Sequence, residues 1–98
     1  MLTYDAAKAV EGGSFTIQAG MGPALPLTLV EVVAGRNRAP VPGLPQAFSL
    51  YLKGTPGIIC PQGTYVLENP SLGRLEVFVV PVGDDAETGE FLYQVSFN

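Results

Sequence analysis

Histidine and tryptophan are absent from this sequence, and cysteine occurs once in its 98 residues. Without histidine the chain lacks the commonest general base and the commonest metal ligand of proteins. A single cysteine excludes an intramolecular disulfide and cannot supply the several ligands of a structural zinc site. No serine stands in a Gly-x-Ser-x-Gly context, and none has a histidine to activate it. These absences predict a protein that is not an enzyme and carries no cofactor.

Charged residues are also scarce, at 14% of the chain, against about 25% in an average globular protein. Five basic and nine acidic residues give a net charge of −4. The basic residues are scattered apart from the pair Arg36 and Arg38, whereas a nucleic-acid interface needs a clustered positive face. Nucleic acid is therefore not an expected partner.

Long apolar runs are missing as well. The most apolar stretch, Ala24 to Ala34, is interrupted by Pro26, Thr28 and Glu31 and is far shorter than the roughly 20 residues that span a bilayer. The first residues do not form a basic leader followed by an apolar segment. With a single cysteine, this pattern predicts a cytoplasmic protein without a membrane segment.

What is abundant is glycine and proline, with 12 and 9 residues, alongside 47% hydrophobic residues. That many backbone breakers argue against a chiefly helical fold, and that much apolar content argues against disorder. The length fits one domain over residues 1–98. We expect an all-β domain built of strands and turns.

One short helix is expected near the N-terminus, over Tyr4 to Glu11. Thr3 can cap its first turn, Asp5 complements the positive helix end, and Gly12-Gly13 ends it. A helix of two turns is marginal alone and has to be held by packing. It should serve as a lid or plug of the domain.

After Ser14 the apolar residues recur with period two, which indicates strands with one buried face. Six such segments occur, at residues 15–18, 25–33, 48–53, 64–68, 75–80 and 91–97. The turn Asn69 to Gly73 should pair the fourth and fifth as a hairpin. Mostly short connections favour an antiparallel meander curled into a small barrel or barrel-like sandwich, in which Phe15, Phe48, Phe91 and Phe97 contribute to the core.

Two connections stand out as partner-binding candidates. Gly35 to Gln46 holds three prolines and should be a long loop. Within it, Arg36 and Arg38 could bind an anion or an acidic partner, although a stiff surface loop is the default explanation. The connection Gly54 to Gly63 carries Ile58 and Ile59, which loops rarely expose without a reason.

Two of the predicted strands are apolar on both faces, in the segments Leu29 to Val33 and Val77 to Val80. Either the helix and the long loops cover the second face, or a protein partner or another copy of the chain does. The sequence leaves these alternatives open.

Other chemistry-bearing residues have simple structural explanations. The carboxylates of Asp84, Asp85, Glu87 and Glu90 could hold a cation, but acidic residues and glycine also suit a solvated hairpin tip. Cys60 is expected to be a small buried thiol.

Several segments together resemble a family of bacterial all-β domains, about 100 residues long and of unknown function. They are residues 13–15, 27–32, 48–50, 61–65, 72–73, 77–81 and 93–98. The resemblance covers most of the chain and implies an all-β fold. Its motifs look like core and turn residues, so it carries no catalytic residues across. It also suggests proteins like those of the phage tail collar as a class of partner.

These observations favour a non-enzymatic protein-binding or assembly module with Arg36, Arg38, Ile58 and Ile59 as the candidate contact residues. One alternative is a small-ligand barrel with Tyr51, Tyr65 and Tyr93 lining a pocket. Another is an accessory protein of a phage-tail-like assembly, as implied by the resemblance. The small molecule, if any, cannot be identified from the sequence.

Overall fold

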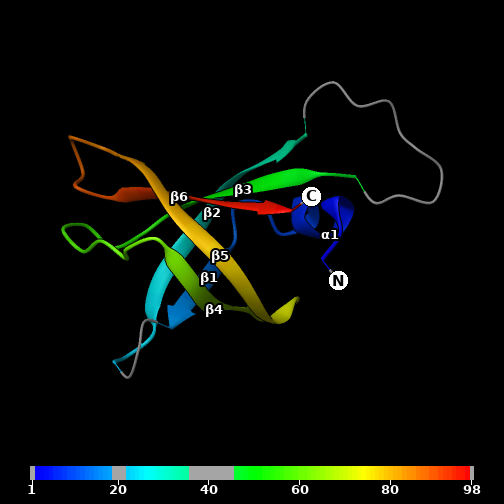
Figure 1. Cartoon of the computed structure of the whole chain (residues 1–98), viewed down its shortest axis with the longest axis horizontal. Coiled ribbons are helices and arrows are strands. Elements are labelled where there is room, and N and C mark those ends of the chain that lie inside the picture. The colour runs from blue at the N-terminus through cyan, green and yellow to red at the C-terminus, as the bar shows by residue number, and fades with distance from the viewer. Residues whose placement is uncertain (1, 19–21, 36–45, 98) are drawn as a thin grey trace.

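A computed structural model describes residues 2–18, 22–35 and 46–97 of the chain. One helix precedes six strands, which agrees with the predicted number and order of elements. They are α1 (Tyr4–Ala9), β1 (Ser14–Gln18), β2 (Leu25–Ala34), β3 (Phe48–Lys53), β4 (Gly63–Asn69), β5 (Gly73–Asp84) and β6 (Phe91–Phe97) (Figure 1).

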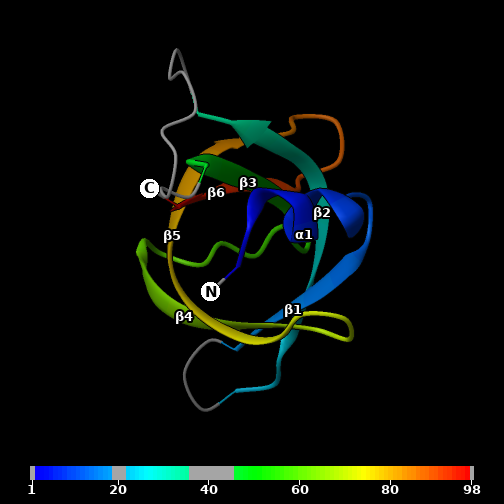
Figure 2. The same ribbon diagram turned by 90° about the vertical axis from the view of Figure 1, so that its right-hand side faces the viewer.

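The strands close into an antiparallel barrel in the order β1-β2-β3-β6-β5-β4, and Figure 2 looks into the ring that they form. The predicted all-β barrel is confirmed, but the simple meander is wrong. β4 pairs with β1 and not with β3, so the barrel consists of two three-stranded meanders joined along β3–β6 and β1–β4. The reason is the connection of residues 54–62, which crosses one end of the barrel instead of turning back beside β3.

Two irregularities interrupt the strands that look apolar on both faces. In β2 the pairing register shifts between Leu29 and Glu31, and this bulge turns Val32 inward while Val30 stays outside. In β5 a second shift lies between Pro81 and Gly83. The predicted β4–β5 hairpin is present, although β5 continues beyond Val80 because it keeps pairing with β6 past this bulge.

Alternating side chains of every strand fill the barrel. The most completely buried are Phe15, Ile17, Leu29, Leu50, Leu52, Leu67, Val79, Tyr93 and Val95. Burying each large apolar side chain contributes on the order of 1.5–3 kcal/mol. Of the four phenylalanines predicted in the core, Phe15 and Phe48 are buried, whereas Phe91 and Phe97 are only partly buried at the two ends of β6. Tyr93 and Val95 occupy the centre of that strand in their place.

The helix α1 covers one barrel opening, as predicted for a plug (Figure 2). Ala7 is fully buried against the core. The ring of Tyr4 meets Phe48 edge-on at 6.1 Å, and Phe48 stacks on Phe97 at 4.8 Å. The hydroxyl of Thr3 caps the helix by accepting a hydrogen bond from the Ala6 N–H.

A polar contact also ties the helix to β2. The Glu11 carboxylate accepts a 2.7 Å hydrogen bond from the Val32 N–H and pairs with Lys8 at 3.0 Å. These interactions hold the pKa of Glu11 below its usual range, the Val32 N–H contributing most. Glu11 lies beyond the end of α1, so the helix is shorter than predicted because its expected last turn is used for this contact.

The barrel therefore has two different ends (Figure 1). We call the end carrying α1 and the β4–β5 turn the helix end. The opposite end, with residues 54–62 after β3 and residues 85–90 after β5, is the loop end. In the part of the chain that the structure describes, no helix has the length and apolarity needed to cross a membrane.

Candidate functional site

Two of the four predicted contact residues lie together at the loop end. Ile58 and Ile59 are 44% and 52% exposed, which is high for neighbouring isoleucines. Arg36 and Arg38 lie outside the described residues, so the site described below is built on Ile58 and Ile59. We call residues 54–62 the isoleucine loop.

Backbone hydrogen bonds fix the first half of the isoleucine loop. The Gly54 N–H donates to the Phe91 carbonyl at 2.9 Å, and the Gly57 N–H donates to the Gly89 carbonyl at 2.9 Å. The Ile58 N–H closes a turn onto Thr55. Gly57 has φ +75°, a left-handed conformation that favours glycine. The loop thus runs along the start of β6 and the residues just before it.

Tyr93 fixes the second half from inside the barrel. Its ring is completely buried, and its hydroxyl accepts a 2.9 Å hydrogen bond from the Cys60 N–H. The same hydroxyl donates a longer one, at 3.4 Å, to the Ile58 carbonyl. Burial raises the pKa of Tyr93. Cys60 itself is buried, as the sequence predicted.

Tyr65 adds a third attachment. Its hydroxyl donates a 2.6 Å hydrogen bond to the Pro61 carbonyl, and burial raises its pKa. The isoleucines are therefore held on both sides by hydrogen bonds, while their own side chains remain exposed. Such a loop presents two apolar groups in a fixed position, which lowers the entropy lost when a partner binds.

The acidic residues Asp85, Glu87 and Glu90 lie in the neighbouring loop between β5 and β6. Asp85 makes most of the hydrogen bonds that hold this loop. The Asp85 carboxylate accepts hydrogen bonds from the Glu87 N–H at 2.9 Å and the Thr88 N–H at 3.4 Å, and it pairs with Lys53 at 3.3 Å. These contacts lower the pKa of Asp85, the Glu87 N–H contributing most. This carboxylate is an Asx-turn acceptor within the hairpin tip. Within the described residues, no cluster of three or more potential metal ligands occurs.

Of the three tyrosines proposed to line a ligand pocket, Tyr51 lies apart from the other two. Tyr51 lies on the outer wall, between the fully buried Leu50 and Leu52 of β3, and its hydroxyl accepts a hydrogen bond from Gln94. Tyr93 points inward and binds the isoleucine loop. The alternation of side chains along β3 thus separates Tyr51 from Tyr65 and Tyr93, whose hydroxyls bind the backbone of the isoleucine loop.

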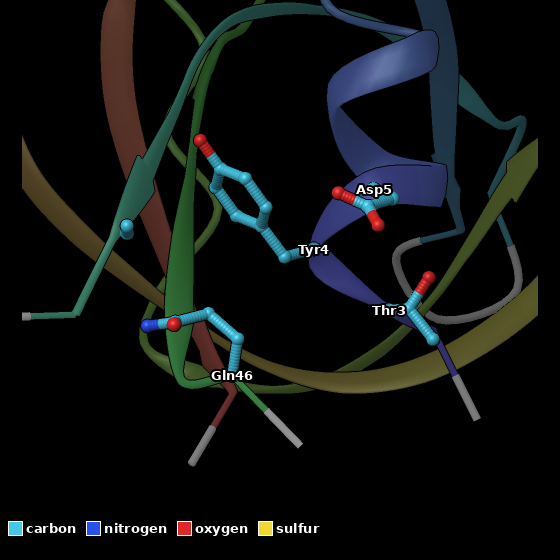
Figure 3. A pocket seen from close by; sticks show the side chains of 5 residues that line it. Thr3, Tyr4, Asp5 and Gln46 are labelled. Carbon is cyan, nitrogen blue, oxygen red and sulfur yellow. The ribbon is translucent and has the colours of Figure 1, made fainter. Parts of the chain in front are cut away.

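A hollow of about 360 Å³ lies at the helix end (Figure 3). It is lined by Thr3, Tyr4, Asp5, Ala34 and Gln46. The Thr3 hydroxyl is already used as the helix cap, and the Tyr4 ring packs on Phe48. From the described residues the hollow offers one carboxylate, one phenol and the Gln46 amide, which supply hydrogen bonds but no activated nucleophile.

Further exposed apolar side chains lie elsewhere on the wall. Val30 and Val33 are on β2, and Phe78 and Val82 are on β5, each 39–51% exposed. In the described part of the chain, neither the helix nor a loop covers the outer face of β5 at Phe78, the most exposed of the four. Sequence reasoning indicated three of them but missed Val82, because it ended the strand at Val80.

The chain belongs to the family described as Domain of unknown function (DUF6916), whose model matches residues 2–97. This agrees with the all-β family of unknown function suggested by the sequence. No curated protein and no solved structure matches the chain.

Proposed function

We propose that this member of the DUF6916 family is a non-enzymatic protein-binding module that contacts its partner through Ile58 and Ile59. The observation that carries the proposal is the combination of a fixed backbone and exposed apolar side chains in the isoleucine loop. Two adjacent apolar side chains that an ordered loop keeps exposed support an interaction site there.

The energies involved fit such a role. Burying the exposed half of each isoleucine contributes on the order of 1 kcal/mol. Because hydrogen bonds to Tyr93 and Gly89 already hold the backbone, little ordering entropy opposes the gain. The two residues act as a central contact of a larger interface rather than as the whole of it.

The non-enzymatic part of the proposal is supported by how the reactive groups are used. The Tyr93 hydroxyl binds loop backbone, and the Asp85 carboxylate binds turn amides and Lys53. Both are therefore structural groups. The partner in this proposal is another protein or a second copy of the chain, in the cytoplasm, and a role in a phage-tail-like assembly is one form of it.

Site-specific photocrosslinking tests the proposal. A photoreactive amino acid replaces Ile59 in one variant and Phe78, which is 51% exposed on the barrel wall, in a control variant. Expressed in the source cells, the variant at 59 should yield one dominant crosslinked protein that the variant at 78 does not. Ile58→Ser/Ile59→Ser should then abolish binding of that purified protein, whereas Phe78→Ser should not.

The reverse pattern would contradict the proposal. If Phe78→Ser abolishes binding and Ile58→Ser/Ile59→Ser leaves it intact, the wall of β5 is the contact surface. If neither position crosslinks, the exposed isoleucines are not a binding element. Both serine variants should remain folded, since substitutions of exposed residues usually change stability by less than about 0.5 kcal/mol.

A further inference from the structure

The isoleucine loop lies directly against the acidic hairpin tip. The Gly57 N–H donates to the Gly89 carbonyl at 2.9 Å, and a side chain built on Gly89 would stand 3.8 Å from the Pro56 side chain. Ile58 follows Gly57, and Glu90 follows Gly89. The apolar pair is therefore bordered by the segment that holds most of the acidic residues of this end.

The charges of this end are not balanced. The described part of the chain contains two ion pairs, Lys8–Glu11 at the helix end and Lys53–Asp85 at the loop end. The remaining described basic residue, Arg74, lies at the start of β5, at the helix end. Asp84, Glu87 and Glu90, in and beside the hairpin tip that contacts the isoleucine loop, therefore carry negative charge that no described basic residue pairs with.

From this arrangement we infer that the partner presents an apolar contact bordered by lysine or arginine residues. The inference rests on the proposed function and adds the chemistry of the partner. An acidic partner would be repelled by Asp84, Glu87 and Glu90, whereas a basic border gains attraction and faster association. The isoleucines form the apolar contact, and the carboxylates favour a partner whose contact is bordered by positive charge.

The inference is tested by adding peptides of defined sequence to the whole chain and measuring the change in its amide chemical shifts. The probes are a short peptide alternating lysine and leucine, a second alternating glutamate and leucine, and a third alternating lysine and serine. The lysine-leucine peptide should bind saturably and shift the amides of residues 57–59 and 87–90. The other two should bind at least tenfold more weakly, because the glutamate-leucine peptide lacks the positive charge and the lysine-serine peptide lacks the apolar side chains.

Matched variants separate charge from structure. Glu87→Gln/Glu90→Gln should weaken the lysine-leucine peptide roughly three- to tenfold. Glu68→Gln/Glu76→Gln makes the same change in net charge on exposed positions of β4 and β5 and should leave binding within twofold. Raising the salt from about 0.01 M to about 1 M shortens the screening length from about 30 Å to 3 Å and should weaken binding as well.

The outcomes distinguish the inference from the proposed function. If the glutamate-leucine peptide binds the same amides equally well, the inference fails while the isoleucines remain a binding element. If Glu68→Gln/Glu76→Gln weakens binding as much as Glu87→Gln/Glu90→Gln, the effect is one of net charge and the inference fails too. If the lysine-serine peptide binds as tightly as the lysine-leucine peptide, the site is merely an acidic patch and both are contradicted.

Discussion

The hydroxyl of Tyr93 lies 2.9 Å from the backbone nitrogen of Cys60 and accepts its hydrogen bond inside the barrel. Tyr93 thus contributes both to the barrel core and to the isoleucine loop. Its ring is a fully buried element of the core, and its oxygen holds the loop that carries Ile58 and Ile59. The position of the candidate contact surface is therefore linked to the packing of the barrel.

Removal of this oxygen should loosen the loop without emptying the core. Tyr93→Phe leaves the Cys60 N–H buried without its partner, which is expected to cost about 1–3 kcal/mol of unfolding free energy. Urea denaturation measures that loss, and the Cys60 amide should exchange faster. Tyr51→Phe removes a hydroxyl on the outer wall and should change stability by less than about 0.5 kcal/mol. Equal losses in both variants would contradict the assigned role of Tyr93.

Gly54 lies where the loop passes over the Tyr93 ring. A Cβ atom there would stand 2.9 Å from a ring carbon of Tyr93 and 3.2 Å from Leu27. Since the ring is enclosed by the core, Gly54→Ala should destabilise the protein by about 1–3 kcal/mol. Gly83→Ala is the control, because no atom lies within 4 Å of its Cβ position. Thermal unfolding should separate the two, and an unchanged midpoint for Gly54→Ala would refute the close packing.

At the helix end of the barrel, Asn69 links the β4–β5 turn to the start of β1. It is buried, its Oδ1 accepts hydrogen bonds from the Ser71 and Leu72 N–H groups, and its Nδ2 donates to the Ser14 carbonyl at 3.1 Å. Asn69→Ala leaves these groups unpaired and should lower the unfolding free energy by about 2 kcal/mol. Asn69→Asp keeps the acceptor and loses the donor. An alanine variant as stable as the natural chain would show that water replaces these contacts.

Acid should release the helix from β2 through Glu11. The pKa of Glu11 is lowered in the folded state, so its contribution to stability is present above the unfolded value of about 4.3 and is lost as the pH falls through the lower folded value. The Val32 amide donates to this carboxylate, so its protection factor, which is the intrinsic exchange rate at a given pH divided by the observed rate, should fall at acid pH. In Glu11→Gln that pH dependence should disappear. Its persistence would assign the effect to another carboxylate.

The faces of the strands could be predicted because side chains alternate along a strand. Leu50 and Leu52 are buried and Tyr51 is outside, as the period-two pattern of that segment indicates. The β4–β5 hairpin could be predicted from its turn, but the pairings of β1 with β4 and of β3 with β6 could not. Ile17 lies opposite Leu67 of β4, and no local pattern links two segments so far apart in the sequence.

The same distinction holds for the candidate site. The apolar character of Ile58 and Ile59 and their loop position were visible in the sequence. Their attachment to Tyr93 and the contact between Gly57 and Gly89 join segments about 30 residues apart, and only closure of the barrel brings these together. The acidic border of the isoleucine loop could therefore not be predicted.

Hydrogen exchange of the Gly57 and Cys60 amides, with and without the protein crosslinked through position 59, tests the central claim most directly. The claim is that the isoleucine loop is fixed before it binds and that the partner then covers it. Both amides should be protected in the free protein, because they donate to Gly89 and Tyr93, and they should exchange still more slowly in the complex. Unprotected amides in the free protein, or rates that the partner leaves unchanged, would contradict it.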